Sequence, residues 1–294
     1  MKHPALFLAA LGLASAALAD PSTIGEGDSY AWAPNIGWLE LRPNAPTFGE
    51  GIVLTDTHLS GFAWSDSTGW INFGDGTPAN GIRYGNADGA DSGVNHDGAG
   101  NLSGLAWSAN LGWINFGWAN ATDPNRPRFD LLSGGFSGYA WSANSGWINL
   151  DTGILKTDAL CIVDSDADGI SDAWELDRAV QGQKSGLGVF TAGGDADGDG
   201  VSDKNEYLAD TDPLDPTDRL RILAIGPSEG GSSLTWTSRP TRLYRTADST
   251  DLVEWIWSES LTAQEGPQTT SDVNHNADRH HFFKVQAVLP LKKN

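Results

Sequence analysis

Hydrophobic and polar positions alternate in a phrase that occurs four times within residues 30–150. Each copy contains Ala-Trp, a short loop, and then Gly-Trp followed by Ile or Leu. Alternation with a period of two is typical of β-strands, and a glycine at the end of the loop supplies the positive φ that a tight hairpin needs. We therefore expect four β-hairpins, in each of which two tryptophans six residues apart lie opposite each other: Trp32 and Trp38, Trp64 and Trp70, Trp107 and Trp113, Trp141 and Trp147.

The surrounding residues predict an all-β repeat domain over residues 20–156. Apolar runs at 51–54 and 128–132 are expected to add a third strand to their hairpins, whereas the Gly-, Asn- and Asp-rich segment 85–100 is expected to be a loop. Both faces of the tryptophan strands carry bulk, with Trp107 on one face and Phe116 on the other. A single exposed sheet is therefore excluded, while a solenoid, a sandwich, a barrel and a small propeller all satisfy the pattern.

The regular occurrence of the tryptophans indicates a structural role in every copy. We therefore expect them to form the repeat core rather than a carbohydrate-binding surface, which is the alternative that flat indole rings suggest. Trp118 lies outside the pattern and is a freer candidate for a ligand contact. Asn72, Asn115 and Asn149 recur after the second tryptophan, where they would form a hydrogen-bonded ladder or line a groove. The phrase resembles Ala-Trp-Ser…Gly-Trp-Ile-Asn-Phe repeats of exported proteins from environmental bacteria, for which no activity is implied.

The C-terminal part, residues 219–290, has short apolar runs at regular intervals. Strands are expected at 220–224, 233–237, 241–245, 252–257 and 281–288, separated by Gly, Pro, Ser and Asp. This spacing predicts a small β-sandwich. The order of strands resembles the fibronectin type III-like modules that follow calcium repeats in large exported bacterial proteins. The fold class is therefore mainly β, with a short α-containing segment between the two β domains.

That middle segment, residues 157–218, is strongly acidic. The chain carries a formal charge of −20, and residues 158–218 hold 16 acidic and three basic residues, a net charge of −13. Such density repels itself unless cations neutralise it. It also argues against nucleic acid or an anionic membrane as a partner, because both require basic patches.

Two acidic runs in this segment share one spacing. Each has carboxylates at offsets 1, 3, 5, 9 and 12 and a glycine at offset 6, which is the pattern that wraps a loop around Ca²⁺. The alternative, a disordered acidic linker, does not account for two matches in register. The expected oxygen ligands of the first ion are Asp164, Asp166, Asp168, Asp172, Glu175 and the carbonyl of Ile170, and those of the second are Asp195, Asp197, Asp199, Asp203, Glu206 and the carbonyl of Val201.

These loops resemble thrombospondin type 3 repeats and the related EF-hand-like and dockerin-like loops of secreted bacterial proteins. Ser171 and Ser202 at offset 8, where a typical EF-hand has Ile or Val, favour the thrombospondin-like version. A short helix is expected after each loop, with a small core of Trp174, Leu176, Tyr207 and Leu208. Whether Asp210, Asp212 and Asp215 complete the calcium shells is left open by the sequence.

The start of the chain predicts export. Residues 1–19 read as a secretory signal peptide, and no later apolar run approaches the length of a membrane span. Cys161 is the single cysteine, so no intramolecular disulfide is expected, and its apolar neighbours predict a buried thiol. A secreted or cell-surface location follows.

The sequence contains no nucleophile elbow, phosphate-binding loop, dinucleotide-binding fingerprint or zinc-protease motif. His275, His280 and His281 lie near Asp278, but without a nucleophile or zinc-binding motif they are expected to be loop and strand-start residues. We therefore expect a non-enzymatic, calcium-binding structural or adhesive protein of the cell surface or matrix, with glycans or other surface proteins as partners. A carbohydrate-binding protein is the alternative, and a glycan hydrolase is less favoured.

Overall fold

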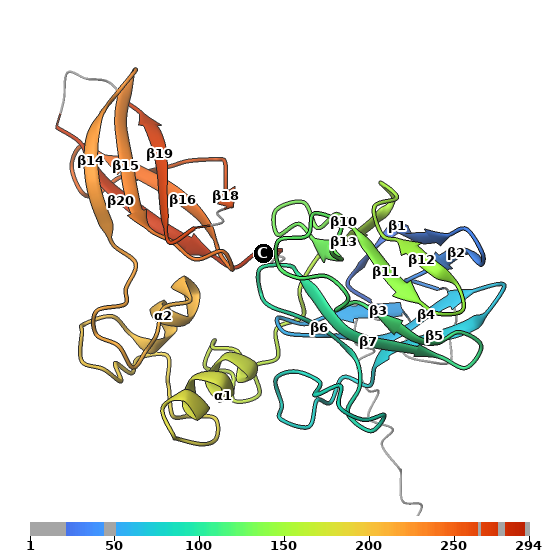
Figure 1. Cartoon of the computed structure of the whole chain (residues 1–294). Coiled ribbons are helices and arrows are strands. Elements are labelled where there is room, and N and C mark those ends of the chain that lie inside the picture. Colours follow the sequence, from blue (N-terminus) through green and yellow to red (C-terminus); the bar gives the residue numbers. More distant parts are fainter. Residues whose placement is uncertain (1–21, 44–50, 264–265, 276–279, 292–294) are drawn as a thin grey trace, which may run out of the picture.

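The computed structural model describes residues 22–43, 51–263, 266–275 and 280–291. The expected signal peptide lies outside the described residues. Figure 1 shows an N-terminal β-barrel, a middle segment with two short helices, and two small sheets at the C-terminal side. The mainly β fold class is therefore confirmed.

The four hairpins form a closed antiparallel barrel of eight strands. In each hairpin the two tryptophans are register partners, as the sequence predicts. The last strand of the fourth hairpin pairs with the first strand of the first, and this pairing closes the ring. The strands in order are β1 (Ile24–Ala33), β2 (Gly37–Glu40), β4 (Leu59–Ser65), β5 (Gly69–Gly74), β7 (Leu102–Ser108), β8 (Gly112–Asn115), β11 (Tyr139–Ser142) and β12 (Gly146–Asn149).

Neighbouring hairpins meet at four seams that share one register. At each seam the residue two positions after the second tryptophan of one hairpin lies opposite the first tryptophan of the next. The four pairs are Glu40 with Trp64, Asn72 with Trp107, Asn115 with Trp141, and Asn149 with Trp32. The sequence repeat is therefore also a repeat in space.

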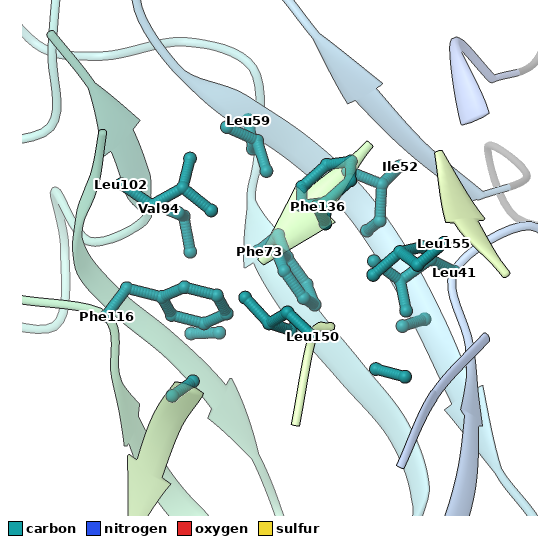
Figure 2. Close-up of a cluster of buried hydrophobic side chains, with 14 of the residues drawn as sticks. Leu41, Ile52, Leu59, Phe73, Val94, Leu102, Phe116, Phe136, Leu150 and Leu155 are labelled. Atoms are coloured by element: carbon teal, nitrogen blue, oxygen red, sulfur yellow. The ribbon is translucent and has the colours of Figure 1, made fainter. Parts of the chain in front are cut away.

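The barrel interior is filled by the residues that alternate with the tryptophans. The alanine before each first tryptophan and the Ile or Leu after each second one are at most 3% exposed. Phe73, Phe116 and Leu150 add a further layer, which Figure 2 shows together with Leu41. An eight-stranded barrel has an interior just wide enough for side chains of this size.

The tryptophans consequently lie on the outside of the barrel, and the expectation that they form the core is wrong. Successive side chains of a strand point to opposite faces, so burial of the Ala and Ile positions sends every tryptophan outward. Six of the eight are between 38% and 52% exposed: Trp32, Trp38, Trp107, Trp113, Trp141 and Trp147.

Short strands flank the barrel. β3 (Gly51–Leu54) pairs with β4, which confirms the third strand expected at 51–54. At 128–132 only β9 (Arg128–Phe129) is a strand, and it pairs with β10 (Phe136–Ser137). β6 (Val94–His96) pairs with β7 inside the segment expected to be a loop, because Val94 and His96 are buried there. β13 (Leu155–Thr157) pairs with β1.

The C-terminal residues form two small antiparallel sheets. One contains β14 (Ile222–Ser228), β15 (Gly231–Thr237) and β19 (Gln268–Asn274), and the other contains β16 (Leu243–Ser249), β17 (Ile256–Trp257), β18 (Thr262–Ala263) and β20 (Phe282–Val288). Leu234, Trp236 and Tyr244 from both sheets share a core cluster. The strand expected at 252–257 is reduced to its last two residues, since Val253 is 79% exposed in a turn.

Candidate metal sites in the acidic connector

Each acidic run forms a loop that leads directly into a helix. α1 (Asp172–Gln181) follows the first loop and α2 (Asp203–Ala209) follows the second. Ser171 and Ser202 cap these helices, because each serine side chain accepts a hydrogen bond from the backbone N–H three residues later. The serines at offset 8 therefore act in helix capping.

Three aspartates gather in each loop. Carboxylate oxygens of Asp164, Asp166 and Asp168 lie within 4.8 Å of one another, and those of the corresponding aspartates of the second loop do the same: Asp195, Asp197 and Asp199. Three acidic oxygens at this separation suit a hard cation such as Ca²⁺, which binds six to eight oxygens. The structure therefore brings together the residues at offsets 1, 3 and 5 of each loop, and their role as calcium ligands stays a prediction.

The first aspartate of each loop also folds the loop. The Asp164 carboxylate accepts hydrogen bonds from the backbone N–H of Asp168 (3.2 Å) and Gly169 (2.9 Å). Asp195 accepts from Asp199 and Gly200 in the same way. The two glycines have φ values of 89° and 90°, which a residue with a Cβ rarely adopts. The two acidic loops therefore contain the same turn, with the same hydrogen bonds and the same glycine conformation.

Glu175 and Glu206, at offset 12, are the strongest indication of an ion. Both residues are fully buried, yet one carboxylate oxygen of each, Oε2, has no hydrogen-bond partner among the described residues. Asp168 and Asp197 each have a similar Oδ2 atom. Leaving a buried carboxylate oxygen unpaired is costly, and a bound cation removes that cost.

The electrostatics of these two glutamates agree with that interpretation. Burial, followed by repulsion from the neighbouring loop aspartates, raises the pKa of Glu175 to about 7 and the pKa of Glu206 to about 8. The protein without a cation therefore disfavours the charged form of both groups. A divalent cation among the same oxygens would favour it.

The aspartates at offset 9 have other partners. Both carboxylate oxygens of Asp172 accept from Ser165, one from its N–H (2.8 Å) and one from its hydroxyl (2.5 Å). Asp203 accepts from the N–H groups of Thr191 and Ala196, both at 2.9 Å. These hydrogen bonds hold each loop against the start of the helix that follows it. Neither aspartate belongs to the groups of three carboxylates described above. That Asp172 and Asp203 are ligands stays a prediction.

The residues expected to offer carbonyl ligands lie beside the third aspartate. The backbone N–H of Ile170 donates to Asp168 Oδ1 (2.9 Å), and that of Val201 donates to Asp199 Oδ1 (2.7 Å). The side chain of Ile170 is fully buried. Both positions are thus held next to the loop carboxylates, and their role as carbonyl ligands also stays a prediction.

The three aspartates that follow α2 are engaged away from the loops. Asp210 pairs with Arg178 at 3.3 Å and Arg242 at 3.8 Å. Asp212 and Asp215 accept hydrogen bonds from the backbone within their own turns. The structure gives these three carboxylates roles in the join to the C-terminal sheets and in local turns.

A small core holds the two helices together. Trp174 lies 5.6 Å, between ring centroids, from both Phe190 and Tyr207, and Leu208 packs against this cluster. Leu176 is not in the cluster and lies instead against Gly81 of the N-terminal domain. Sequence reasoning missed Phe190, which is fully buried in the segment between the two loops.

Hydrogen bonds join the connector to both neighbouring regions. The Ser171 hydroxyl donates to the Asp56 carboxylate, which extends from the barrel domain. Arg242 of the C-terminal part donates to the carbonyls of Tyr207 (2.7 Å) and Leu208 (3.0 Å). Within the connector, Lys204 Nζ donates to the carbonyl of Asp168 at 3.1 Å, so α2 contacts the first loop. The two loops are therefore connected to each other through α2, and the connector that contains them is hydrogen-bonded to both β regions.

The aromatic residues of the barrel surface form pairs. The rings of Trp64 and Trp70, Trp107 and Trp113, and Trp141 and Trp147 meet edge to face, with centroids 4.7–4.9 Å apart. Trp118 packs on Trp147 at 4.7 Å and donates its indole N–H to the carbonyl of Tyr139.

Each recurring asparagine hydrogen-bonds to the backbone at or near the end of its strand. The Oδ1 atoms of Asn72, Asn115 and Asn149 accept from the N–H two residues later, at 2.7–3.0 Å. This local turn is the role the structure gives them, in place of a ladder between copies.

The remaining candidate residues lie elsewhere. His275 and His281 stack with centroids 4.0 Å apart, and His281 pairs with Asp248 at 3.0 Å. Asp278 lies outside the described residues. Cys161 is exposed, so the prediction of a buried thiol is wrong. Its backbone forms an isolated parallel bridge with Thr55, which follows β3.

Comparison of the chain with protein-family models, with curated proteins and with solved structures finds no significant match. Among the described residues, no helix is long and apolar enough to cross a membrane.

Proposed function

We propose that this protein is a calcium-stabilised modular protein with a structural or adhesive role at the cell surface or in the extracellular matrix. Each acidic loop takes one Ca²⁺ ion, as in the thrombospondin type 3-like repeats that its spacing resembles. The observation that supports this most is the pair of fully buried glutamates, Glu175 and Glu206, each with an oxygen that lacks a partner among the described residues.

In this proposal the three loop aspartates and the offset-12 glutamate supply carboxylate oxygens, and the carbonyls of Ile170 and Val201 add one ligand each. Asp172 and Asp203 contribute to the sites by holding the loop backbone in place. Each also contacts the ion through a water molecule, as the residue at this position of an EF-hand loop often does. Extracellular modules of this kind bind calcium at about 10⁻⁴–10⁻³ M, which favours constitutive loading over signalling.

Calorimetric titration of Ca²⁺ into the chelator-stripped full chain tests the proposal. We expect two sites for the natural sequence and one site for either Glu175→Gln or Glu206→Gln. The matched control is Asp177→Asn, which also removes one negative charge from α1 but alters a half-buried carboxylate that contacts Gln181. Unchanged binding in both Gln variants, or no binding at all, would overturn the two-site assignment.

A second role, carbohydrate binding by the barrel, is favoured by the outward position of the tryptophans. Exposed aromatic clusters mark interaction surfaces, and indole faces suit the apolar faces of sugar rings. We assign glycan polymers of a surface or matrix as the partner. The fibronectin type III-like C-terminal module would then act as a spacer.

Binding of soluble polysaccharides and a glycan array to the full chain tests this role. The double variant Trp107→Ala, Trp113→Ala should lose binding, while Trp257→Ala, a half-buried tryptophan outside the barrel, should retain it. Equal binding by both variants would exclude the barrel tryptophans as the glycan surface. Far-UV circular dichroism confirms that each variant is folded.

A further inference from the structure

One seam of the barrel carries a groove on its outer surface. The groove lies between the first and second hairpins, has a volume of about 380 Å³ and opens to solvent. It is lined by Tyr30, Trp38, Glu40, Trp64, Asp66 and Ile154. Three aromatic rings and two carboxylates therefore face one space, far along the chain from the acidic loops.

Both carboxylates depart from the repeat. Glu40 occupies the seam position that is Asn in the other three copies, as in Asn115. Asp66 occupies the hairpin-loop position that is Pro or Ala in the other three, as in Ala109. The first change is in one hairpin and the second is in its neighbour, yet the seam register places Glu40 opposite Trp64 and thus brings both changes into one groove.

The two carboxylates are arranged around the rings. The Trp64 indole N–H donates to Asp66 Oδ1 at 2.9 Å. Burial raises the pKa of Tyr30, and the Glu40 and Asp66 carboxylates raise it further. Among the described residues, neither carboxylate has a basic side chain within ion-pair distance (compare the six ion pairs that form elsewhere). The groove is therefore both aromatic and negative.

The chemistry of the lining favours one ligand class. A hard metal ion requires six or more oxygens, whereas most of this wall is indole and phenol. An alkylammonium group is attracted by the negative faces of aromatic rings, and tryptophan is the best of them. It also gains from the two neighbouring carboxylates, and the Trp64 indole can stay bonded to Asp66.

We infer that this groove binds an organic cation through an alkylammonium group, held against Tyr30, Trp38 and Trp64 by the charges of Glu40 and Asp66. The ammonium belongs either to a free quaternary ammonium compound or to a lysine side chain of a partner protein. The site is separate from the proposed calcium sites and differs in ligand class from the proposed glycan surface, so it stands or falls independently.

Titration of tetramethylammonium chloride into the calcium-loaded full chain, with NaCl held at constant total ionic strength, is the direct test. We expect saturable quenching of tryptophan fluorescence. The double variant Glu40→Gln, Asp66→Asn should weaken binding at least about tenfold, because it keeps the size of both side chains and removes both charges. The control Asp88→Asn, Asp123→Asn removes one exposed and one half-buried charge of the barrel loops and should bind as the natural sequence does.

Two further titrations separate the sources and the rival ligand. Nα-acetyl-lysine methylamide tests the lysine source, and choline tests the free compound; the tighter of the two identifies the physiological source. Cellobiose tests a neutral sugar. Absence of saturable tetramethylammonium binding, equal binding by the two double variants, or cellobiose binding that is tighter than either cation and unaffected by Glu40→Gln, Asp66→Asn would overturn the inference.

Discussion

The barrel and the acidic connector are stabilised in opposite ways. The barrel buries a continuous apolar core that every repeat helps to build, with Ala and Ile layers inside and tryptophans outside. The connector contributes five buried residues to a small core cluster, which Leu289 of the C-terminal part completes, and the connector carries a net charge of −13. The four-fold repeat closes the barrel by strand pairing, whereas the connector gathers three aspartates in each of its two loops, an arrangement that a bound cation would stabilise. The difference predicts which region responds to which perturbation.

Removal of calcium should have the largest effect, and only on the connector. If each site binds at about 10⁻⁴–10⁻³ M, 10 mM Ca²⁺ stabilises the folded connector by about 1.4–2.7 kcal/mol per site, and both contributions are lost in chelator. Hydrogen exchange should then rise in α1, α2 and both loops. Exchange in the barrel strands should not change. Faster exchange in the barrel strands as well would refute the claim that only the connector depends on calcium.

Truncation in the barrel core should produce the converse result. Ile114→Ala removes a side chain that is 1% exposed and should lower the free energy of unfolding of the barrel by about 2–5 kcal/mol. Denaturant unfolding monitored by barrel tryptophan fluorescence measures the loss. Calcium stoichiometry should stay the same as in the natural sequence; a lost site would indicate that the barrel supports the connector directly.

The stability of the calcium-free connector, measured in chelator, should depend on pH more strongly than that of the barrel. Glu175 and Glu206 have pKa values raised to about 7 and about 8, above the ordinary value of 4.5. Between pH 4.5, the ordinary pKa, and pH 8, the folded state therefore holds more protons than the unfolded state. The free energy of unfolding of the connector consequently falls as the pH rises through this range. Urea midpoints at pH 5 and pH 8 measure this slope. Glu175→Gln, Glu206→Gln should flatten it, and a slope that survives in the double variant would assign it to other groups.

The smallest expected effect concerns the hairpin tips of the barrel. Asn110 donates to Thr68 O, Asn144 to Leu111 O and Asn35 to Ser145 O, each at 2.9–3.0 Å, so neighbouring tips are bonded. The second hairpin has Ser67 at this position. Asn110→Ala should cost about 0.5–1.5 kcal/mol, the net value of one hydrogen bond. Ser67→Asn is the reverse test, because it would add a hydrogen bond between hairpin tips. We expect the melting temperature to rise in Ser67→Asn and to fall in Asn110→Ala.

The sequence predicted those features of the barrel that depend on local spacing. The positions of Gly37, Gly69, Gly112 and Gly146 specified the hairpin turns, and their φ values of 71–77° confirm the interpretation. Closure was not predictable, since the β12–β1 pairing depends on how four hairpins twist together. The outward position of the tryptophans follows from closure: bulk on both strand faces leaves open which face is enclosed, and the barrel radius decides in favour of Ala and Ile.

The candidate metal sites divide in a similar way. Offsets 1, 3 and 5 were predictable because a short loop forces these carboxylates together. The contact of Asp172 with Ser165 was not, because a carboxylate at offset 9 can turn toward the loop backbone or toward an ion with the same sequence. β19 was missed because its residues are mostly polar, and it is held by pairing with β15 rather than by burial.

The common register of the four seams has a consequence for connectivity. The seam between β12 and β1 joins the two ends of the barrel sequence, yet it pairs Asn149 with Trp32 as the internal seams pair their own residues. The order in which the hairpins occur along the polypeptide is therefore not what holds the ring together. A circular permutant of the barrel with new termini in the exposed loop between β8 and β9, and a linker between β13 and β1, would retain all four seams.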